Sequence, residues 1–352
     1  MTRRVVLGVL AVAVLVAAAL TAVLRPWTPD PPDRLVAAAW LPVWDERAPA
    51  SLAAALDEGG LTEVSPTWAT VRPDGSLAVT PPPPEVRERL AAADGVQVIP
   101  AVQNYADGAW QGDAVARLLA DPAAAEAHRR ALVDLALTSG WDGVDVDYES
   151  LPPLAGPVFT QFLRALRDDL HAHGLQLTVA VPARDAEETP YALAYSYRLI
   201  GQIADQVRLM TYDHAWSGSP AGPVAPASWV EDVVAYAVQH VPRHKLMLGL
   251  ATYGYDWVGD RGSTVQAVDA LALADRVGAR PRWDDAAAAW TFGYAEGGRE
   301  HTVWFEDARS LARKQQLAVA AGLRGIAIWQ LGGEDPQVWT SVSSATRGGT
   351  PS

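Results

Sequence analysis

The chain has 352 residues, of which 49% are hydrophobic and 20% are charged; this is the balance of a folded globular protein and excludes a wholly disordered one. The formal net charge of −13, without any run of basic residues, argues against a nucleic-acid partner. Cysteine is absent, which excludes disulfides, thiol catalysis and cysteine-bound zinc.

Residues 5–24 form the first element that the sequence predicts. They carry no charge and follow Arg3 and Arg4, and a helix of this length would be about 30 Å long, the thickness of a bilayer core. We therefore expect residues 1–25 to be a signal-anchor, with a cleaved signal peptide as the alternative, followed by a Pro-rich linker at 26–34. Because positive residues stay on the cytoplasmic side, the rest of the chain is expected to be extracytoplasmic, either membrane-anchored through residues 5–24 or secreted.

Short apolar runs alternate with helical stretches along the rest of the chain. The clearest helix is expected at 157–173, where apolar residues recur at helical spacing and Gly174 follows as a stop. This alternation is typical of an α/β fold of the (β/α)8 TIM-barrel type, predicted here over 35–340. An open, doubly wound sheet is less favoured because no glycine-rich phosphate loop follows the first strand. The expected strands are 35–40, 63–67, 96–102, 143–148, 175–181, 207–212, 245–250 and 325–329.

Two stretches depart from this alternation. Residues 256–302 lie between the seventh and eighth expected strands and are rich in aromatic residues, so we expect a small α+β insertion that forms one wall of a cleft rather than a long mobile loop. Residues 341–352 are polar and lack an apolar period, which predicts a disordered tail. The histidines lack the spacing of a metal site, so no metal is expected.

An acidic segment at 142–149 is the most informative part of the chain. Residues two apart in a strand point to the same side, so Asp145, Asp147 and Glu149 share one face. Burying three acids is costly, which indicates a functional site rather than a structural one. A calcium-binding loop would have polar, flexible spacers, whereas valine and tyrosine stand between these acids.

Acid catalysis explains this segment better than calcium binding. Neighbouring like charges cannot all ionise easily, so at least one carboxyl keeps a proton near neutral pH. Glu149 is the last of the three acids and lies at the carboxyl end of its strand, where the active sites of barrels form. Glu149 is therefore the expected proton donor to a leaving oxygen.

Residues 142–149 match the DGxDxDxE signature of glycoside hydrolase family 18, the chitinase-like family, and the chain resembles that family in three further segments, in the same order. These are 210–213 (MTYD), 248–254 (LGLATYG) and 325–329 (GIAIW). Residues 216–224 and 301–307 resemble more specifically its spore-cortex-lytic and germination-related branch. The positions that depart from this branch, and are expected to line outer subsites, are 214–215, 251–252 and 255.

The resemblance implies a reaction as well as a barrel. It implies an enzyme that cleaves β-1,4 bonds next to N-acetylglucosamine, in peptidoglycan glycan or chitin oligosaccharides, without a metal or organic cofactor. Apart from the resemblance, a monomer is expected. The implied mechanism is substrate-assisted and retaining, so the separation of two carboxyls does not decide the stereochemistry. The alternative is a catalytically silent, lectin-like glycan-binding protein on the same fold, which usually lacks the proton donor that this chain has in Glu149.

The resemblance also implies roles for single residues. Glu149 would protonate the glycosidic oxygen, while Asp147 would hold the acetamido N–H and Asp145 would share a proton behind it. Tyr212 would donate its hydroxyl to the acetamido oxygen, and Trp329 would stack beneath the sugar ring. The implied substrate-binding residues are Asp213, Trp329, Asp142, Met210, Tyr253 and Asn104. Weaker candidates for sugar contacts are Tyr105, Arg184, Trp110, Trp216 and Trp257.

Overall fold

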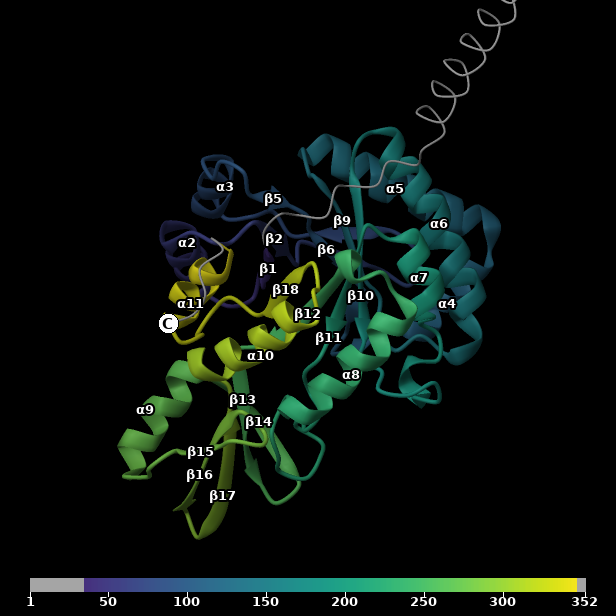
Figure 1. The fold of residues 1–352 in the computed structure, drawn as a ribbon. Coiled ribbons are helices and arrows are strands. Elements are labelled where there is room, and N and C mark those ends of the chain that lie inside the picture. Colours follow the sequence, from purple (N-terminus) through teal and green to yellow (C-terminus); the bar gives the residue numbers. More distant parts are fainter. Residues whose placement is uncertain (1–34, 347–352) are drawn as a thin grey trace, which may run out of the picture. The chain divides into compact units, whose positions relative to one another are not determined.

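The structure is a computed structural model that describes residues 35–346. The predicted export segment, the linker and the end of the predicted tail, at 1–34 and 347–352, lie outside the described residues. Between residues 35 and 346, no helix is both long and apolar enough to cross a membrane. Figure 1 shows parallel strands with helices around them and a second, smaller sheet.

The parallel strands form a ring of the TIM-barrel type, as predicted. β18 (Gly325–Trp329) pairs with β1 (Val36–Leu41), so the last strand of the ring lies against the first. The strands between them follow the order of the sequence. They are β2 (Glu63–Pro66), β3 (Ala69–Val71), β5 (Gln97–Val98), β6 (Ala101–Gln103), β9 (Gly143–Asp147), β10 (Gln176–Pro182), β11 (Gln206–Met210) and β12 (Leu246–Ala251).

Two positions of the ring are each filled by a pair of short strands. β2 and β3 are consecutive in the chain and fill one position, and β5 and β6 fill the next. β2 pairs with β5, and β3 pairs with β6. Proline has no N–H to donate and interrupts a strand, and Pro66 and Pro100 stand at these breaks. The single strand expected at 96–102 is therefore two strands. A short β4 (Leu77–Val79) pairs with β3 in the antiparallel direction.

Helices surround the ring (Figure 1). The predicted helix at 157–173 is α6 (Gly156–Ala172), and its apolar stripe is buried. The remaining helices around the ring are α2 (Ala48–Glu58), α3 (Pro84–Ala91), α4 (Gly112–Ala120), α5 (Pro122–Ser139), α7 (Tyr197–Ile203), α8 (Ala227–His240), α10 (Ala308–Ala320) and α11 (Gln337–Thr346). A small hairpin of β7 (Tyr105–Ala106) and β8 (Ala109–Trp110) follows β6.

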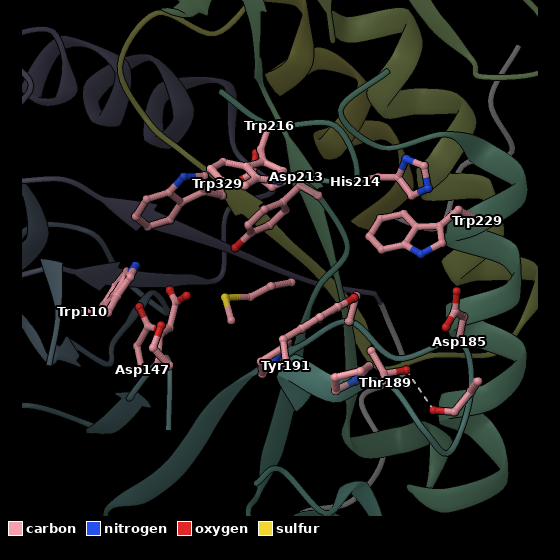
Figure 2. Close-up of a pocket in the computed structure, with 18 of the residues that line it drawn as sticks. Trp110, Asp147, Asp185, Thr189, Tyr191, Asp213, His214, Trp216, Trp229 and Trp329 are labelled. Carbon is pink, nitrogen blue, oxygen red and sulfur yellow. Dashed lines mark hydrogen bonds between the residues drawn. The ribbon is translucent and has the colours of Figure 1, made fainter. Parts of the chain in front are cut away.

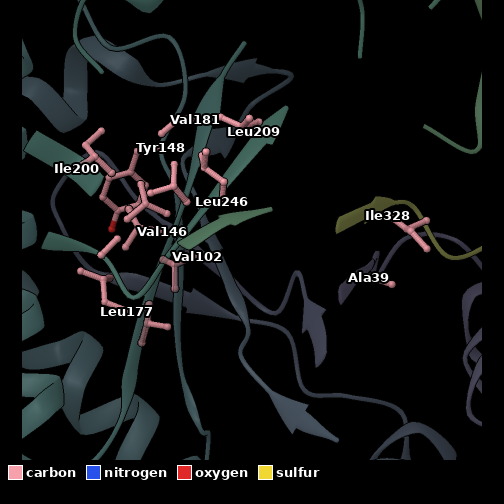
Figure 3. Packing of buried hydrophobic residues seen from close by; sticks show 14 of the residues in the cluster. Ala39, Val102, Val146, Tyr148, Leu177, Val181, Ile200, Leu209, Leu246 and Ile328 are labelled. Atoms are coloured by element: carbon pink, nitrogen blue, oxygen red, sulfur yellow. The ribbon is translucent and has the colours of Figure 1, made fainter. Parts of the chain in front are cut away.

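The main hydrophobic core lies between the ring and its helices, and Figure 3 shows part of it. Val146 and Tyr148 of the β9 segment belong to this core and are buried. Because side chains alternate along a strand, Asp145 and Asp147 point to the opposite side, into the ring. The predicted alternation therefore places two carboxyls inside the ring and leaves Glu149 just beyond the end of the strand.

The insertion between β12 and β18 is a five-stranded antiparallel sheet with one helix, which confirms the predicted insertion. It starts at Tyr253, immediately after β12, and ends at Phe305, so it is slightly longer than the expected 256–302. Phe292, Val303 and Phe305 form its own small core with α9. Its elements are β13 (Tyr253–Val258), β14 (Arg261–Gln266), α9 (Ala267–Val277), β15 (Arg282–Asp284), β16 (Ala289–Glu296) and β17 (Arg299–Phe305).

The prediction of a disordered tail from residue 341 is wrong for residues 341–346, which belong to α11. Val338, Trp339 and Val342 of this helix are buried, and the indole of Trp339 donates a hydrogen bond to Glu334 at 2.9 Å. Three buried side chains hold the helix in place, although its polar residues outnumber them.

Candidate active site

A cleft of about 750 Å³ lies at the carboxyl ends of the ring strands (Figure 2). This is the end at which barrel enzymes carry their active sites. The cleft collects six of the residues predicted from the sequence. They are Asp147, Glu149, Met210, Tyr212, Asp213 and Trp329.

Glu149 is placed to hold a proton at neutral pH. Burial raises the pKa of its carboxyl well above the ordinary value, and the negative charges of Asp147 and Asp213 raise it further. The pKa of Asp147 is raised to about 7, first by burial and then by the charge of Asp145. The pair therefore holds at least one proton near neutral pH, which is the condition for a general acid.

Asp145 is held inside the ring by three donors from three different strands. Its carboxylate accepts hydrogen bonds from Trp40 Nε1 at 3.0 Å, Thr178 Oγ1 at 2.5 Å and Arg208 Nη1 at 2.9 Å. Arg208 is fully buried and also pairs with Glu63 at 3.1 Å. Both oxygens of Asp145 therefore accept hydrogen bonds from groups other than Asp147, and the expected sharing of a proton between the two acids stays a prediction.

Asp147 has one engaged and one free carboxyl oxygen. Oδ2 accepts a hydrogen bond from Gln103 Nε2 at 2.8 Å. Oδ1 is buried and has no hydrogen-bond partner among the described residues. A buried polar atom without a partner is uncommon in a native protein, and here it belongs to a carboxylate that lines the cleft.

Tyr212 and Asp213 follow β11 at the same end of the ring. Burial and the neighbouring acids raise the pKa of the Tyr212 phenol, so this group stays protonated and can donate a hydrogen bond. Asp213 Oδ1 accepts hydrogen bonds from Tyr253 at 2.6 Å and from Tyr255 at 2.9 Å. The backbone of Asp213 has a φ of +56°, a conformation that costs energy for most residues other than glycine.

A second hollow, of about 700 Å³, lies beside the cleft and shares Trp329 and Asp213 with it. Trp44, which is 58% exposed, lines this hollow but not the cleft, and its ring centroid is 6.4 Å from that of Trp329. Space therefore extends on both sides of Trp329. Aromatic faces with polar groups between them are suited to sugar rings.

Other predicted residues lie outside the cleft. Asp142 stands at the opposite, amino end of β9, where it accepts a hydrogen bond from the Val98 N–H at 2.7 Å, so its contact with a substrate is not supported. Asn104 is fully buried and contacts the backbone of Glu149. Tyr253 lines the second hollow rather than the cleft, and it contacts two cleft residues, Asp213 through its hydroxyl and Tyr212 through its ring.

Of the weaker candidates for sugar contacts, two line the cleft and two are buried elsewhere. Trp110 and Trp216 line the cleft, as expected. Trp257 is 1% exposed, because it packs against Tyr255 and against Ala215 and Val224 of the segment after β11, and it cannot be a stacking platform. Arg184 is also buried, and its guanidinium donates to Tyr195 and Glu187 carbonyls of its own loop.

Several cleft residues were not found from the sequence. Tyr191 and Trp229 line the cleft without having been predicted to do so (Figure 2). His214, which was expected to line an outer subsite, lies beside Trp229 at a ring-centroid distance of 5.1 Å. Trp229 lies on α8, where an aromatic residue is indistinguishable from a core residue in the sequence. Gln103 was also missed, since a glutamine at the end of a strand carries no signal of its own.

Comparison with known proteins assigns this geometry to a family. The profile of glycosyl hydrolases family 18 matches residues 59–334. The chain therefore belongs to family 18 of the glycoside hydrolases. Its resemblance to this family, predicted from four ordered segments, is confirmed.

Two relatives come from Bacillus subtilis. One is a putative sporulation-specific glycosylase, 34% identical over 236 residues, or 65% of this chain and 56% of the relative. The other is a cortical fragment-lytic enzyme, 33% identical over 279 residues, or 77% of this chain and 64% of the relative. The chain thus spans less than two thirds of the length of either relative.

Two solved structures are also similar. A chitinase from Chromobacterium violaceum is 32% identical with a TM-score of 0.83, covering 88% of this chain and 98% of its own. The spore cortex-lytic enzyme SleL of Bacillus cereus is 29% identical with a TM-score of 0.78, covering 88% of this chain and 74% of its own. The chain is therefore homologous both to chitinases and to cortex-lytic enzymes.

Proposed function

We propose that the protein is an exported glycosidase that cleaves β-1,4 bonds next to N-acetylglucosamine by substrate-assisted, retaining catalysis. The observation that carries this proposal is the pairing in one cleft of Glu149, whose raised pKa keeps a proton, with the unpartnered Oδ1 of Asp147. One group can donate a proton, and the other can accept an N–H hydrogen bond. Tyr212 adds a second donor beside them.

The proposed reaction has two steps. In the first, Glu149 gives its proton to the glycosidic oxygen, the bond from that oxygen to the anomeric carbon breaks, and the acetamido oxygen of the substrate bonds to that carbon. Asp147 Oδ1 accepts the acetamido N–H and offsets the positive charge of the resulting oxazolinium ion. In the second step a water molecule attacks the anomeric carbon, the bond from that carbon to the acetamido oxygen breaks, and a proton of the water passes to Glu149. Two displacements at one carbon retain its configuration.

The proposed substrates are peptidoglycan glycan and chitin oligosaccharides. Support comes from relatives of both kinds: a cortical fragment-lytic enzyme and a chitinase. We further propose that the protein works outside the cytoplasm, anchored by residues 5–24 or secreted after cleavage. This localisation rests on the apolar, uncharged composition of that segment and on the two arginines before it.

The test is to incubate residues 30–352 with N-acetylglucosamine oligomers and with peptide-free peptidoglycan glycan, beside Glu149→Gln, and to identify the products by mass spectrometry. We expect Glu149→Gln to bind glycan but to lose about 10²–10⁴-fold in rate, the usual contribution of a general acid. Full activity of that variant would refute the mechanism. Binding of both glycans without cleavage by the wild type would favour the lectin-like alternative.

A further inference from the structure

Two consecutive amide side chains at the end of β6 contact the two carboxyl residues of the proposed reaction. Gln103 is 5% exposed and Asn104 is 0% exposed, and neither lines the cleft. Both belong to the segment in which β6 pairs with β9, with Gln103 opposite Asp147. Their contacts are therefore set by the register of two neighbouring strands.

Gln103 acts on the side chain of Asp147. Its Nε2 donates to Oδ2 at 2.8 Å, while Oδ1 of the same carboxyl has no partner among the described residues. A donor on one oxygen alone restricts rotation of the carboxyl group. The second oxygen is thereby kept free of the protein's own hydrogen bonds.

Asn104 acts on the backbone of Glu149. Its Nδ2 donates to the Glu149 carbonyl at 2.9 Å, and its Oδ1 accepts the Glu149 N–H at 2.8 Å. Since β9 ends at Asp147, Glu149 lies beyond the strand ladder. The amide of Asn104 supplies both of the hydrogen bonds that a neighbouring strand would otherwise make.

Adjacent contacts hold the same stretch of backbone. The Tyr195 hydroxyl donates to the Tyr148 carbonyl at 2.7 Å and accepts the Leu151 N–H at 3.3 Å. Between them, Ser150 has a φ of +57°, in the left-handed region that non-glycine residues seldom adopt. The turn after Glu149 is therefore fixed by side chains on both sides rather than by its own conformational preference.

We propose that Gln103 and Asn104 are positioning residues for the reaction: Gln103 directs the free oxygen of Asp147 toward the cleft, and Asn104 fixes the Cα position of Glu149. The inference rests on the proposed function, because it gives those two carboxyls their use. Neither amide lines the cleft or the second hollow, so we expect their effect to fall on rate rather than on binding.

The first test compares Gln103→Leu and Asn104→Leu with Gln315→Leu, all in the full chain. Gln315, on α10, is buried to a similar extent, at 4% exposed, and serves as the matched control for loss of a buried amide. We expect kcat on N-acetylglucosamine oligomers to fall by about 10²-fold in the first two variants, the size of effect that a misplaced catalytic group produces. We expect KM to stay within about threefold of the wild type and Gln315→Leu to keep its kcat.

The second test uses Gln103→Glu, which preserves shape and so keeps the inference testable if a leucine variant does not fold. At acid pH the introduced carboxyl is protonated and can donate to Asp147 Oδ2, whereas at higher pH its charge repels Asp147. We expect kcat relative to the wild type to fall as pH rises. Among the described residues, the charged and titratable groups that interact with Asp147 are Asp145, Glu149, Tyr195, Arg208 and Tyr212, and both proteins contain all of them.

The outcomes separate the two proposals. If Glu149→Gln stays active, the proposed function fails and the inference falls with it. If Glu149→Gln is inactive but Asn104→Leu and Gln103→Leu keep the wild-type kcat, the inference alone is wrong. A rise in KM at unchanged kcat, or a pH profile of Gln103→Glu parallel to that of the wild type, would also overturn it.

Discussion

Asp147 is a buried carboxyl whose pKa rises to about 7 from an ordinary value of 3.8. Between these pH values the folded chain binds more protons at this group than the unfolded chain does. The free energy of unfolding therefore falls as pH rises through that range. The same burial that suits Asp147 to its proposed role makes it unfavourable for the stability of the folded chain at neutral pH.

We expect Asp147→Asn to be more stable than the wild type at pH 7, with an advantage that shrinks toward pH 4, although its activity is lost. The rise in Tm should be a few degrees, since about 1 kcal/mol shifts Tm by roughly 2–4 °C in a large domain. Thermal unfolding followed by circular dichroism at several pH values measures this. The exposed Asp134→Asn serves as the control, and a lower Tm for Asp147→Asn at pH 7 would contradict the argument.

At the scale of single residues, the sequence predicted the carboxyls better than their supports. The two-residue period of a strand was enough to place Asp145, Asp147 and Glu149 on one face. The partners of these acids depend on the register between strands, which no local pattern states. Asn104 was therefore assigned to the substrate, whereas it bonds to Glu149, and Gln103 was missed.

At the scale of elements, the apolar runs predicted the ring strands closely. Each ring strand is buried by its neighbouring strands and by the helices, so its sequence is a short apolar run. The breaks at Pro66 and Pro100 were not foreseen, since a proline can end one strand and leave the next in line. The helical part of the predicted tail was missed because its few apolar residues gain their stability from tertiary contacts rather than from helical propensity.

Close approach between β11 and β12 depends on Gly249. A Cβ atom there would lie 2.1 Å from the Leu209 carbonyl oxygen and 3.1 Å from the Tyr212 ring. We expect Gly249→Ala to lower the free energy of unfolding by about 1–3 kcal/mol, as overpacking usually does, and to reduce activity by displacing Tyr212. Urea unfolding and oligomer hydrolysis measure both effects.

The matched control for this change is Gly293→Ala in β16. Its Cβ would come no closer than 3.4 Å to the His301 carbonyl oxygen, so the added methyl meets an ordinary contact. We expect little loss of stability and no loss of activity. Equal destabilisation by the two substitutions would show that the strand spacing at Gly249 is not the cause.

At the scale of the whole molecule, the cleft and the second hollow meet at Trp329, whereas Trp44 lines the second hollow and not the cleft. A glycan that passes over Trp329 would therefore reach Trp44 only if it is long enough. We expect Trp44→Ala to raise KM by about 2–10-fold for long oligomers, from a stacking contribution of about 0.5–1.5 kcal/mol, and to leave KM for the shortest cleaved oligomer unchanged.

Measurement of KM against oligomer length checks this, with Trp283→Ala as the control. Trp283 is a tryptophan of the insertion that lines neither the cleft nor the second hollow. The effect of Trp283→Ala on KM should therefore not depend on oligomer length. An equal effect of Trp44→Ala on short and long oligomers would show that Trp44 does not bind the distal part of the glycan.

The pairing of β1 with β18 joins residues that are far apart in sequence, such as Val36 and Gly325. Contacts of such long separation form late in folding, because a large loop must close first. Until β18 is synthesised, β1 and β12 each present an open edge that invites association with other chains. Trp329, at the end of β18, is also the residue on which both hollows depend. The proposed glycan-binding surface is therefore complete only once the strand that closes the ring has been synthesised.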